Sequence, residues 1–152
     1  MKDVYWIWIA TLGPIGRLPW APGTWASLLA CGMGFFLSFS NPPIQMGVIL
    51  CVCIVGTIVS ERHVQITRKE DSREVVVDEV AGQLITLVFL PFSVSNWVLG
   101  FLMFRILDIW KPFPISWLDR RIKGGVGIMA DDIAAGLIAS LLLQILARTL
   151  PL

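Results

Sequence analysis

One short stretch in the second half of the chain carries residue types that could handle a phosphate group. Arg105, Asp108 and Lys111 recur at intervals of three, so on a helix they share one stripe. Arginine can bind phosphate through two parallel N–H groups, and lysine supplies a point charge. The same spacing also fits an intrahelical salt bridge flanked by basic membrane anchors. The spacing alone favours neither interpretation.

Two acidic pairs each lie near the start of an apolar segment: Asp78-Glu79 and Asp131-Asp132. Carboxylate oxygens are ligands that Mg²⁺ prefers, and the N-terminus of a helix helps to keep carboxylates ionised. Either pair alone is explained by helix capping. Two pairs on one side of the protein, with Asp108 as a further carboxylate, favour a metal site.

Glycines stand at two of the expected helix starts. Gly124, Gly125 and Gly127 lead into an apolar segment and could turn backbone N–H groups toward a phosphate. Gly23 and Thr24 could do the same earlier in the chain, where Thr24 also suits a helix N-cap. Glycines equally make simple sharp turns, and no lysine follows as in a Walker A loop, so these signals are weak alone.

Three further residues have expected roles that are not catalytic. His63 is the only histidine, which excludes imidazole metal sites and mechanisms that need two histidines. Its charged surroundings indicate a surface residue. Gly82 and Gly136 each follow an aspartate by four residues and are expected to let neighbouring helices approach closely.

The composition indicates an integral membrane protein. Of the 152 residues 56% are hydrophobic and 15% charged, with mean hydropathy +0.76, whereas soluble domains carry about 25% charged residues. No charge occurs between Arg17 and Glu61, between Glu79 and Arg105, or between Asp132 and Arg148. The net charge of +1 gives no sign of nucleic-acid binding. The length predicts one domain over residues 1–152.

Hydropathy predicts an all-α membrane bundle of about four to five apolar helices. A short apolar segment at 4–12 and a basic interfacial helix at 115–123 are expected beside them. No removable signal peptide is expected at the N-terminus. The apolar segments occupy residues 25–39, 44–60, 80–104 and 128–150.

The distribution of charge predicts that the block at 80–104, interrupted at 91–96, forms a hairpin of two helices rather than one span. With a hairpin, every acidic residue and every Lys or Arg except Arg148 falls on one side or at its boundary. The turns at 40–43 and 91–96 then carry no charge. The positive-inside rule makes the charged side, and the polar site on it, cytoplasmic.

Taken together, these residues resemble the phosphatidylglycerophosphatase A family. Ala26 stands where that family usually has Gly, and Ser72 where it usually has Pro; neither departure removes a charged group. The motifs that carry the resemblance cover nearly the whole chain: Pro22-Gly23-Thr24-Trp25-x-Ser27, Val77-Asp78-Glu79-Val80-x-Gly82, Phe104-Arg105-x-x-Asp108-x-x-Lys111-Pro112-x-Pro114, Asp119-Arg120-Arg121 and Gly124-Gly125-x-Gly127-Ile128-Met129-x-Asp131-Asp132-x-x-x-Gly136.

The resemblance implies a Mg²⁺-dependent, all-helical, multi-pass enzyme of the bacterial inner membrane. It would hydrolyse phosphatidylglycerophosphate to phosphatidylglycerol and phosphate at the cytoplasmic surface, as a step of phospholipid biosynthesis. Our hypothesis assigns catalysis to Arg105, Asp108 and Lys111, with Asp108 as ligand, general base or orienter of Arg105. The hypothesis has four metal ligands, Asp78, Glu79, Asp131 and Asp132, and five phosphate-binding residues, Gly23, Thr24, Gly124, Gly125 and Gly127.

Two alternatives stay open at this point. A phosphatase for another lipid phosphate headgroup would need the same residue types. A divalent-cation membrane carrier would use the acidic pairs as a transport site, although carriers usually keep such groups near mid-membrane. The sequence does not choose between a covalent intermediate and direct attack by water, and it leaves the oligomeric state and the number of metal ions open.

Overall fold

The structure is a computed structural model that describes residues 2–70 and 72–149. This part of the chain is helical, without a strand, which confirms the all-α class. The elements are α1 (Lys2–Ala10), η1 (Ile15–Arg17), α2 (Pro22–Ser38), α3 (Pro42–Thr67), α4 (Val77–Leu87), α5 (Val94–Trp110), α6 (Ile115–Arg121) and α7 (Gly124–Thr149).

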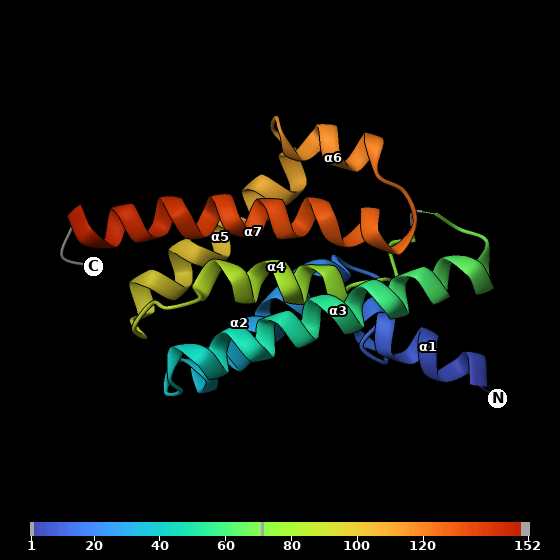
Figure 1. The fold of residues 1–152 in the computed structure, drawn as a ribbon, viewed down its shortest axis with the longest axis horizontal. Helices are drawn as coiled ribbons and strands as arrows, with labels where there is room; N and C mark the ends of the chain where they lie inside the picture. The colour runs from blue at the N-terminus through green and yellow to red at the C-terminus, as the bar shows by residue number, and fades with distance from the viewer. Residues whose placement is uncertain (1, 71, 150–152) are drawn as a thin grey trace.

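The short helix α4 lies at the centre, in contact with α2, α3, α5 and α7 (Figure 1). All its residues are buried except Asp78 and Glu79, which are half-buried at its N-terminal end. The surrounding helices therefore cover the apolar part of α4 and leave its acidic start beside the polar loops.

Two glycines let α4 and α7 pack backbone to backbone. A Cβ on Gly136 would collide with the carbonyl oxygen of Gly82, and one on Gly82 would lie 2.7 Å from the Asp132 carbonyl oxygen. This confirms the packing role expected of Gly82 and Gly136. The close approach also brings the start of α4 level with Asp132.

Residues 80–104 form two helices, as expected, because α4 ends at Leu87 and α5 begins at Val94. The side chain of Ser93 caps α5 by accepting a hydrogen bond from the Asn96 N–H at 3.0 Å. The α2–α3 and α4–α5 turns lie at the left end in Figure 1, together with the end of α7. The end of α3 and the start of α7 lie at the opposite end.

Within residues 2–70 and 72–149, two helices, α3 and α7, are long and apolar enough to cross a membrane, which is fewer than the expected four to five. At 1.5 Å per residue the 11-residue α4 is about 16 Å long, and the 17-residue α2 and α5 are about 26 Å, against a hydrocarbon core of about 30 Å. In the most apolar 18-residue stretch of α3 only 28% of the residues are buried inside the protein. The other apolar side chains of this stretch are therefore free to contact lipid.

Several helix boundaries differ from the expectations. Helix α2 begins at Pro22, where proline's fixed φ suits a first helical position, so Thr24 lies inside the first turn and Ala21 is the N-cap. Helix α3 continues to Thr67 and turns His63 inward, so the expected surface position of this histidine is wrong: its side chain is 1% exposed, and its Nδ1 lies 3.5 Å from the hydroxyl oxygen of Thr67.

Candidate functional site

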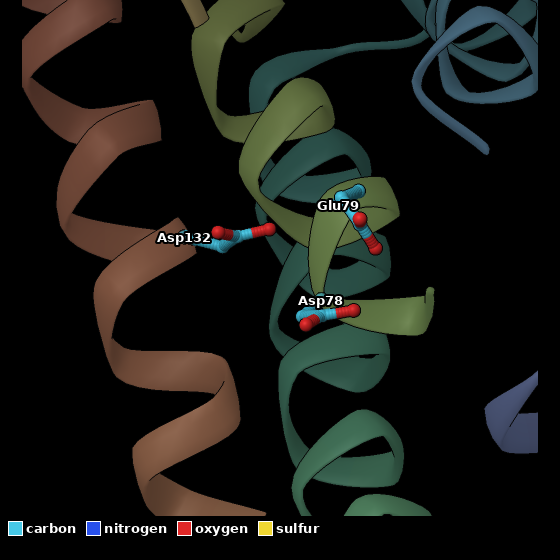
Figure 2. Close-up of side chains that lie close together, drawn as sticks. All are labelled: Asp78, Glu79 and Asp132. Atoms are coloured by element: carbon cyan, nitrogen blue, oxygen red, sulfur yellow. The ribbon is translucent and has the colours of Figure 1, made fainter. Parts of the chain in front are cut away.

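Three carboxylates from two helices converge at the centre of the molecule. Asp78 and Glu79 come from the start of α4 and Asp132 from α7 (Figure 2). One oxygen from each lies within 4.8 Å of the others. Among the described residues, Asp78 Oδ1, Glu79 Oε2 and Asp132 Oδ2 are buried without a hydrogen-bond partner. Because unpaired buried carboxylates are costly, this cluster fits a hard cation that prefers oxygen ligands.

Burial changes the proton affinity of the two α4 carboxylates. Burial, followed by the charges of Glu79 and Asp132, raises the pKa of Asp78 well above its usual value. Burial also raises the pKa of Glu79. A divalent cation between them would oppose both effects and favour the ionised forms.

The start of α4 is held in place by buried neighbours. Val76, directly before the helix, is fully buried, and its N–H donates to the Ala10 carbonyl oxygen at 3.0 Å. Val77 precedes the acidic pair in the chain and packs in one apolar cluster, and Val80 follows the pair and packs in another. The carboxylates thus project from a rigid helix start rather than from a mobile loop.

Gly23, at the start of α2, provides the space that the site needs. A Cβ there would overlap the Glu79 carboxylate and lie 3.3 Å from Arg105 Nη1. The glycine therefore permits α2 to approach both groups closely, and it brings an acidic and a basic residue of the candidate site together. Thr24, the next residue, does not line the pocket described below.

Arg105 and Asp108 form a tight ion pair on α5. Arg105 Nη1 lies 2.6 Å from Asp108 Oδ2, and the two side chains are 14% and 13% exposed. Arg105 Nε is buried and has no partner among the described residues. The pair is the intrahelical salt bridge that the spacing allowed, and it leaves part of the guanidinium available to an anion.

Lys111 does not share a helical face with Arg105 and Asp108, although its spacing had suggested this. It is the C-cap of α5 in the left-handed conformation, with φ 45°, and its side chain crosses to α6 and α7. Its Nζ donates to Asp119 at 2.8 Å and to Asp131 at 2.5 Å. Burial alone would lower the pKa of Lys111, but hydrogen bonds to Asp119 and Asp131 and their charges outweigh it, so the pKa is raised and the ammonium stays charged.

The second acidic pair is divided between two partners. Asp132 belongs to the carboxylate cluster, whereas Asp131 is held by Lys111. Consecutive residues of a helix point about 100° apart, so one pair can serve both groups. Asp131 remains a predicted ligand; its Oδ1 is buried and has no hydrogen-bond partner within the described chain.

The glycines before α7 are arranged differently from a free phosphate-binding loop. They form the first turn of α7, which begins four residues before the expected Ile128. The Gly125 N–H donates to Glu61 Oε2 at 2.7 Å, so a side chain of α3 already occupies that donor. Gly124 and Gly127 do border the pocket, and their phosphate-binding role stays a prediction.

One pocket of about 730 Å³ connects these groups. Of the site residues expected from the sequence, only Thr24 and Gly125 do not line it. Its wall also contains charged residues for which the sequence suggested no role, among them Arg17, Glu70, Arg73, Glu74, Asp119 and Lys123. The sequence signals for these residues were the Asp119-Arg120-Arg121 motif and the density of charge in two segments, 61–79 and 119–123, and Arg17 lies outside both.

Comparisons with known proteins agree with the chemistry of this pocket. Residues 8–147 match a family model described as phosphatidylglycerophosphatase A. Proteins of that name from Escherichia coli (strain K12) and Haemophilus influenzae (strain ATCC 51907 / DSM 11121 / KW20 / Rd) are 38% and 34% identical to this chain over the aligned regions. The aligned regions cover 90% and 78% of this chain and 80% and 74% of those proteins.

A third relative carries a different name. A putative phosphatidylinositol-3-phosphatase from Bacteroides thetaiotaomicron (strain ATCC 29148 / DSM 2079 / JCM 5827 / CCUG 10774 / NCTC 10582 / VPI-5482 / E50) is 32% identical over 138 residues. The aligned region covers 86% of both chains. No solved structure matches the chain.

Proposed function

Because this chain belongs to the phosphatidylglycerophosphatase A family, we propose that it hydrolyses the phosphomonoester of phosphatidylglycerophosphate with the help of a divalent cation, Mg²⁺ being the one its oxygen ligands suit. The observation that carries the proposal is a single pocket with two kinds of group. It holds three carboxylates with unpartnered buried oxygens and, beside them, the cations Arg105 and Lys111.

Asp78, Glu79 and Asp132 would hold the cation, with Asp131 as a further ligand. When bound, the cation polarises the phosphoryl oxygens and offsets their charge. The guanidinium of Arg105 and the ammonium of Lys111 bind the same phosphate and neutralise charge that develops as water attacks phosphorus and the glycerol oxygen leaves.

The acidic neighbours of these cations act as positioning residues. Asp108 Oδ2 is engaged at 2.6 Å by Arg105, which favours the role of orienting the guanidinium over that of general base. Asp119 and Asp131 hold the Lys111 ammonium from two sides, at 2.8 and 2.5 Å. Fixing these two cations before the substrate binds reduces the ordering that the transition state requires.

The site would face the cytoplasm at the membrane boundary of a multi-pass protein. Helix α7 has 26 residues and is about 39 Å long, which exceeds the hydrocarbon core of about 30 Å, so its first turns, with Asp132 at their end, lie near one surface when the helix crosses the bilayer. Five of the 12 Lys and Arg residues of the chain line the pocket, and this gathering of basic residues favours the cytoplasmic side. A substrate headgroup can then remain in water while its acyl chains stay in lipid.

Sidedness can be measured by cysteine labelling. After replacement of Cys31, Cys51 and Cys53, a Lys123→Cys variant places one thiol at the exposed rim of the pocket. A membrane-impermeant maleimide should label it in inverted inner-membrane vesicles and spare it in intact spheroplasts. Labelling only in spheroplasts would place the site on the opposite face.

Activity is tested by phosphate release from phosphatidylglycerophosphate in detergent micelles, with EDTA, Mg²⁺ or Ca²⁺. We expect release that depends on Mg²⁺ and that Asp78→Asn and Asp132→Asn each reduce at least about a hundredfold, the usual scale for loss of a group that stabilises transition-state charge. Unchanged turnover in both variants, with the protein folded, would remove the metal-site assignment.

A second headgroup remains a candidate because the third relative is named as a putative phosphatidylinositol-3-phosphatase at 32% identity. Parallel assays with phosphatidylinositol 3-phosphate and phosphatidate, at equal mole fraction in the same micelles, compare the headgroups directly. A higher kcat/KM for phosphatidylinositol 3-phosphate would reassign the substrate without changing the site.

A further inference from the structure

The pocket is larger than one phosphate group requires, and its cations fall into two sets. The inner set, Arg105 and Lys111, is 14% and 33% exposed and is paired with acidic side chains. The outer set, Arg17, Arg73 and Lys123, lies at the exposed rim of the same pocket. A volume of about 730 Å³ falls in the range of sites that hold a whole small ligand.

The three rim cations differ in whether their side chains already have an acidic or hydrogen-bonding partner. Arg17 lies 3.9 Å from Glu74, and Lys123 Nζ donates to the Asp119 carbonyl oxygen at 3.4 Å. Within residues 2–70 and 72–149, Arg73 makes neither an ion pair nor a side-chain hydrogen bond. Its fork of N–H donors matches the geometry of a phosphate anion.

The segment that carries Arg73 has a rigid base. The Glu74 carbonyl group, next to Arg73, packs directly against Gly16, where any Cβ would overlap it. Val75 and Val76 are buried, the Val75 N–H donates to the Ser72 carbonyl oxygen at 3.0 Å, and Asp78 of the carboxylate cluster follows five residues after Arg73. The backbone at Arg73 is therefore fixed relative to the carboxylate cluster, and the side chain extends from it into the rim of the pocket.

We propose that Arg73 binds the phosphodiester of the lipid substrate, while the buried end of the pocket binds the phosphomonoester. This rests on the proposed function, because that substrate carries both phosphates on one glycerol headgroup. The diester is the phosphate nearer the acyl chains, as expected for a group bound at the rim. Arg73 is then a residue that selects headgroups with a diester next to the monoester.

The experiment separates the two phosphates with two inhibitors of the same reaction. Phosphatidylglycerol, the product, carries only the diester, whereas inorganic phosphate stands for only the monoester. For Arg73→Gln we expect KM for phosphatidylglycerophosphate and Ki for phosphatidylglycerol to rise about tenfold, the scale of one charge-assisted hydrogen bond. Ki for inorganic phosphate should stay within about twofold, and Arg73→Lys should recover part of the loss.

Arg68→Gln is the matched control. Arg68 is an exposed arginine of the same segment that does not line the pocket, so its loss changes the net charge equally without touching the diester. Unchanged phosphatidylglycerol inhibition in Arg73→Gln would overturn the inference, as would equal weakening of both inhibitors or the same effect in Arg68→Gln. Wild-type protein without phosphate release would instead remove the proposed function, and this inference with it.

Discussion

Asp131 and Asp132 are adjacent in α7, yet their carboxylates meet different groups. Asp131 accepts a hydrogen bond from Lys111 Nζ at 2.5 Å, whereas Asp132 faces Asp78 and Glu79 across the α4–α7 contact. The two residues thus link the carboxylate cluster, where we propose that a metal ion binds, to Lys111, where we propose that phosphate binds, through one turn of helix. Their substitution should have separable consequences.

We expect Asp132→Asn to raise the Mg²⁺ concentration needed for half-maximal activity by at least about tenfold, because it removes a charged ligand without changing side-chain volume. Asp131→Asn should lower kcat with a smaller change in that concentration, because its main partner is Lys111. Titration of phosphate release against Mg²⁺ measures both. Equal shifts in the two variants would mean that Asp131 is a ligand of the same rank as Asp132.

Lys111→Gln should lower kcat and also reduce stability by about 2 kcal/mol, since it leaves the Asp131 carboxylate, 7% exposed, without its charged partner. Thermal unfolding in detergent and phosphate release measure the two effects. Lys123→Gln is the control: it removes an exposed lysine whose side chain, within the described residues, donates one long hydrogen bond, to the Asp119 carbonyl oxygen at 3.4 Å. We expect no measurable loss of stability there.

The stability that Lys111 provides should depend on pH in a defined direction. The folded-state pKa of Lys111 is raised above that of an ordinary lysine, about 10.4. The contribution is therefore complete below the unfolded pKa and is lost as pH rises through the higher folded value. The stability difference between wild type and Lys111→Gln should stay constant from about pH 7 to about pH 10. A decline that begins near neutral pH would contradict this.

Gly23→Ala should reduce turnover at least about tenfold while changing stability by only about 1 kcal/mol. The new Cβ overlaps the Glu79 carboxylate, a movable side chain, and displaces it from the cluster. Gly32→Ala in the same helix is the matched control, because a Cβ there meets nothing within 4 Å. It should keep full activity and be slightly more stable, as alanine favours a helix interior. Normal turnover in Gly23→Ala would contradict the close approach of α2.

Gly136→Ala should destabilise the protein by about 1–3 kcal/mol, because the added Cβ meets the α4 backbone rather than a side chain that can move. Turnover should fall as well, since α7 must shift and take Asp132 away from Asp78. Gly47→Ala, in open space on α3, should show neither effect. Thermal unfolding and phosphate release on the same preparations test both parts, and a stable, fully active Gly136→Ala would exclude the backbone contact.

Much of the fold follows from local features of the chain. The charge-free turns at 40–43 and 91–96 correspond to the observed breaks between α2 and α3 and between α4 and α5. Helix lengths follow less well, because hydropathy marks which residues are apolar but not where hydrogen bonding stops. Helix α3 runs on through charged residues to Thr67, and α4 ends at Leu87 inside an apolar block.

The sequence also predicts which residue types form the candidate site, but it does not predict which of these residues contact one another. Asp78 and Glu79 are found beside Asp132, as a metal site requires. Lys111 was placed on a stripe with Arg105, whereas it crosses to Asp119 and Asp131, because the helix ends at that residue. Arg73 and Lys123 belong to no recognised motif, so the sequence does not distinguish them from other charged surface residues.

The sequence by itself determined an apolar all-helical chain with acidic and basic residues gathered at its polar segments, since periodicity and charge act over a few residues. Only the tertiary structure decided which carboxylates meet. Asp78 and Asp132 are far apart in the chain, and the backbone contact between Gly82 and Gly136 sets their depth and rotation. That contact depends on the packing of whole helices, for which a single residue's type and neighbours carry no information.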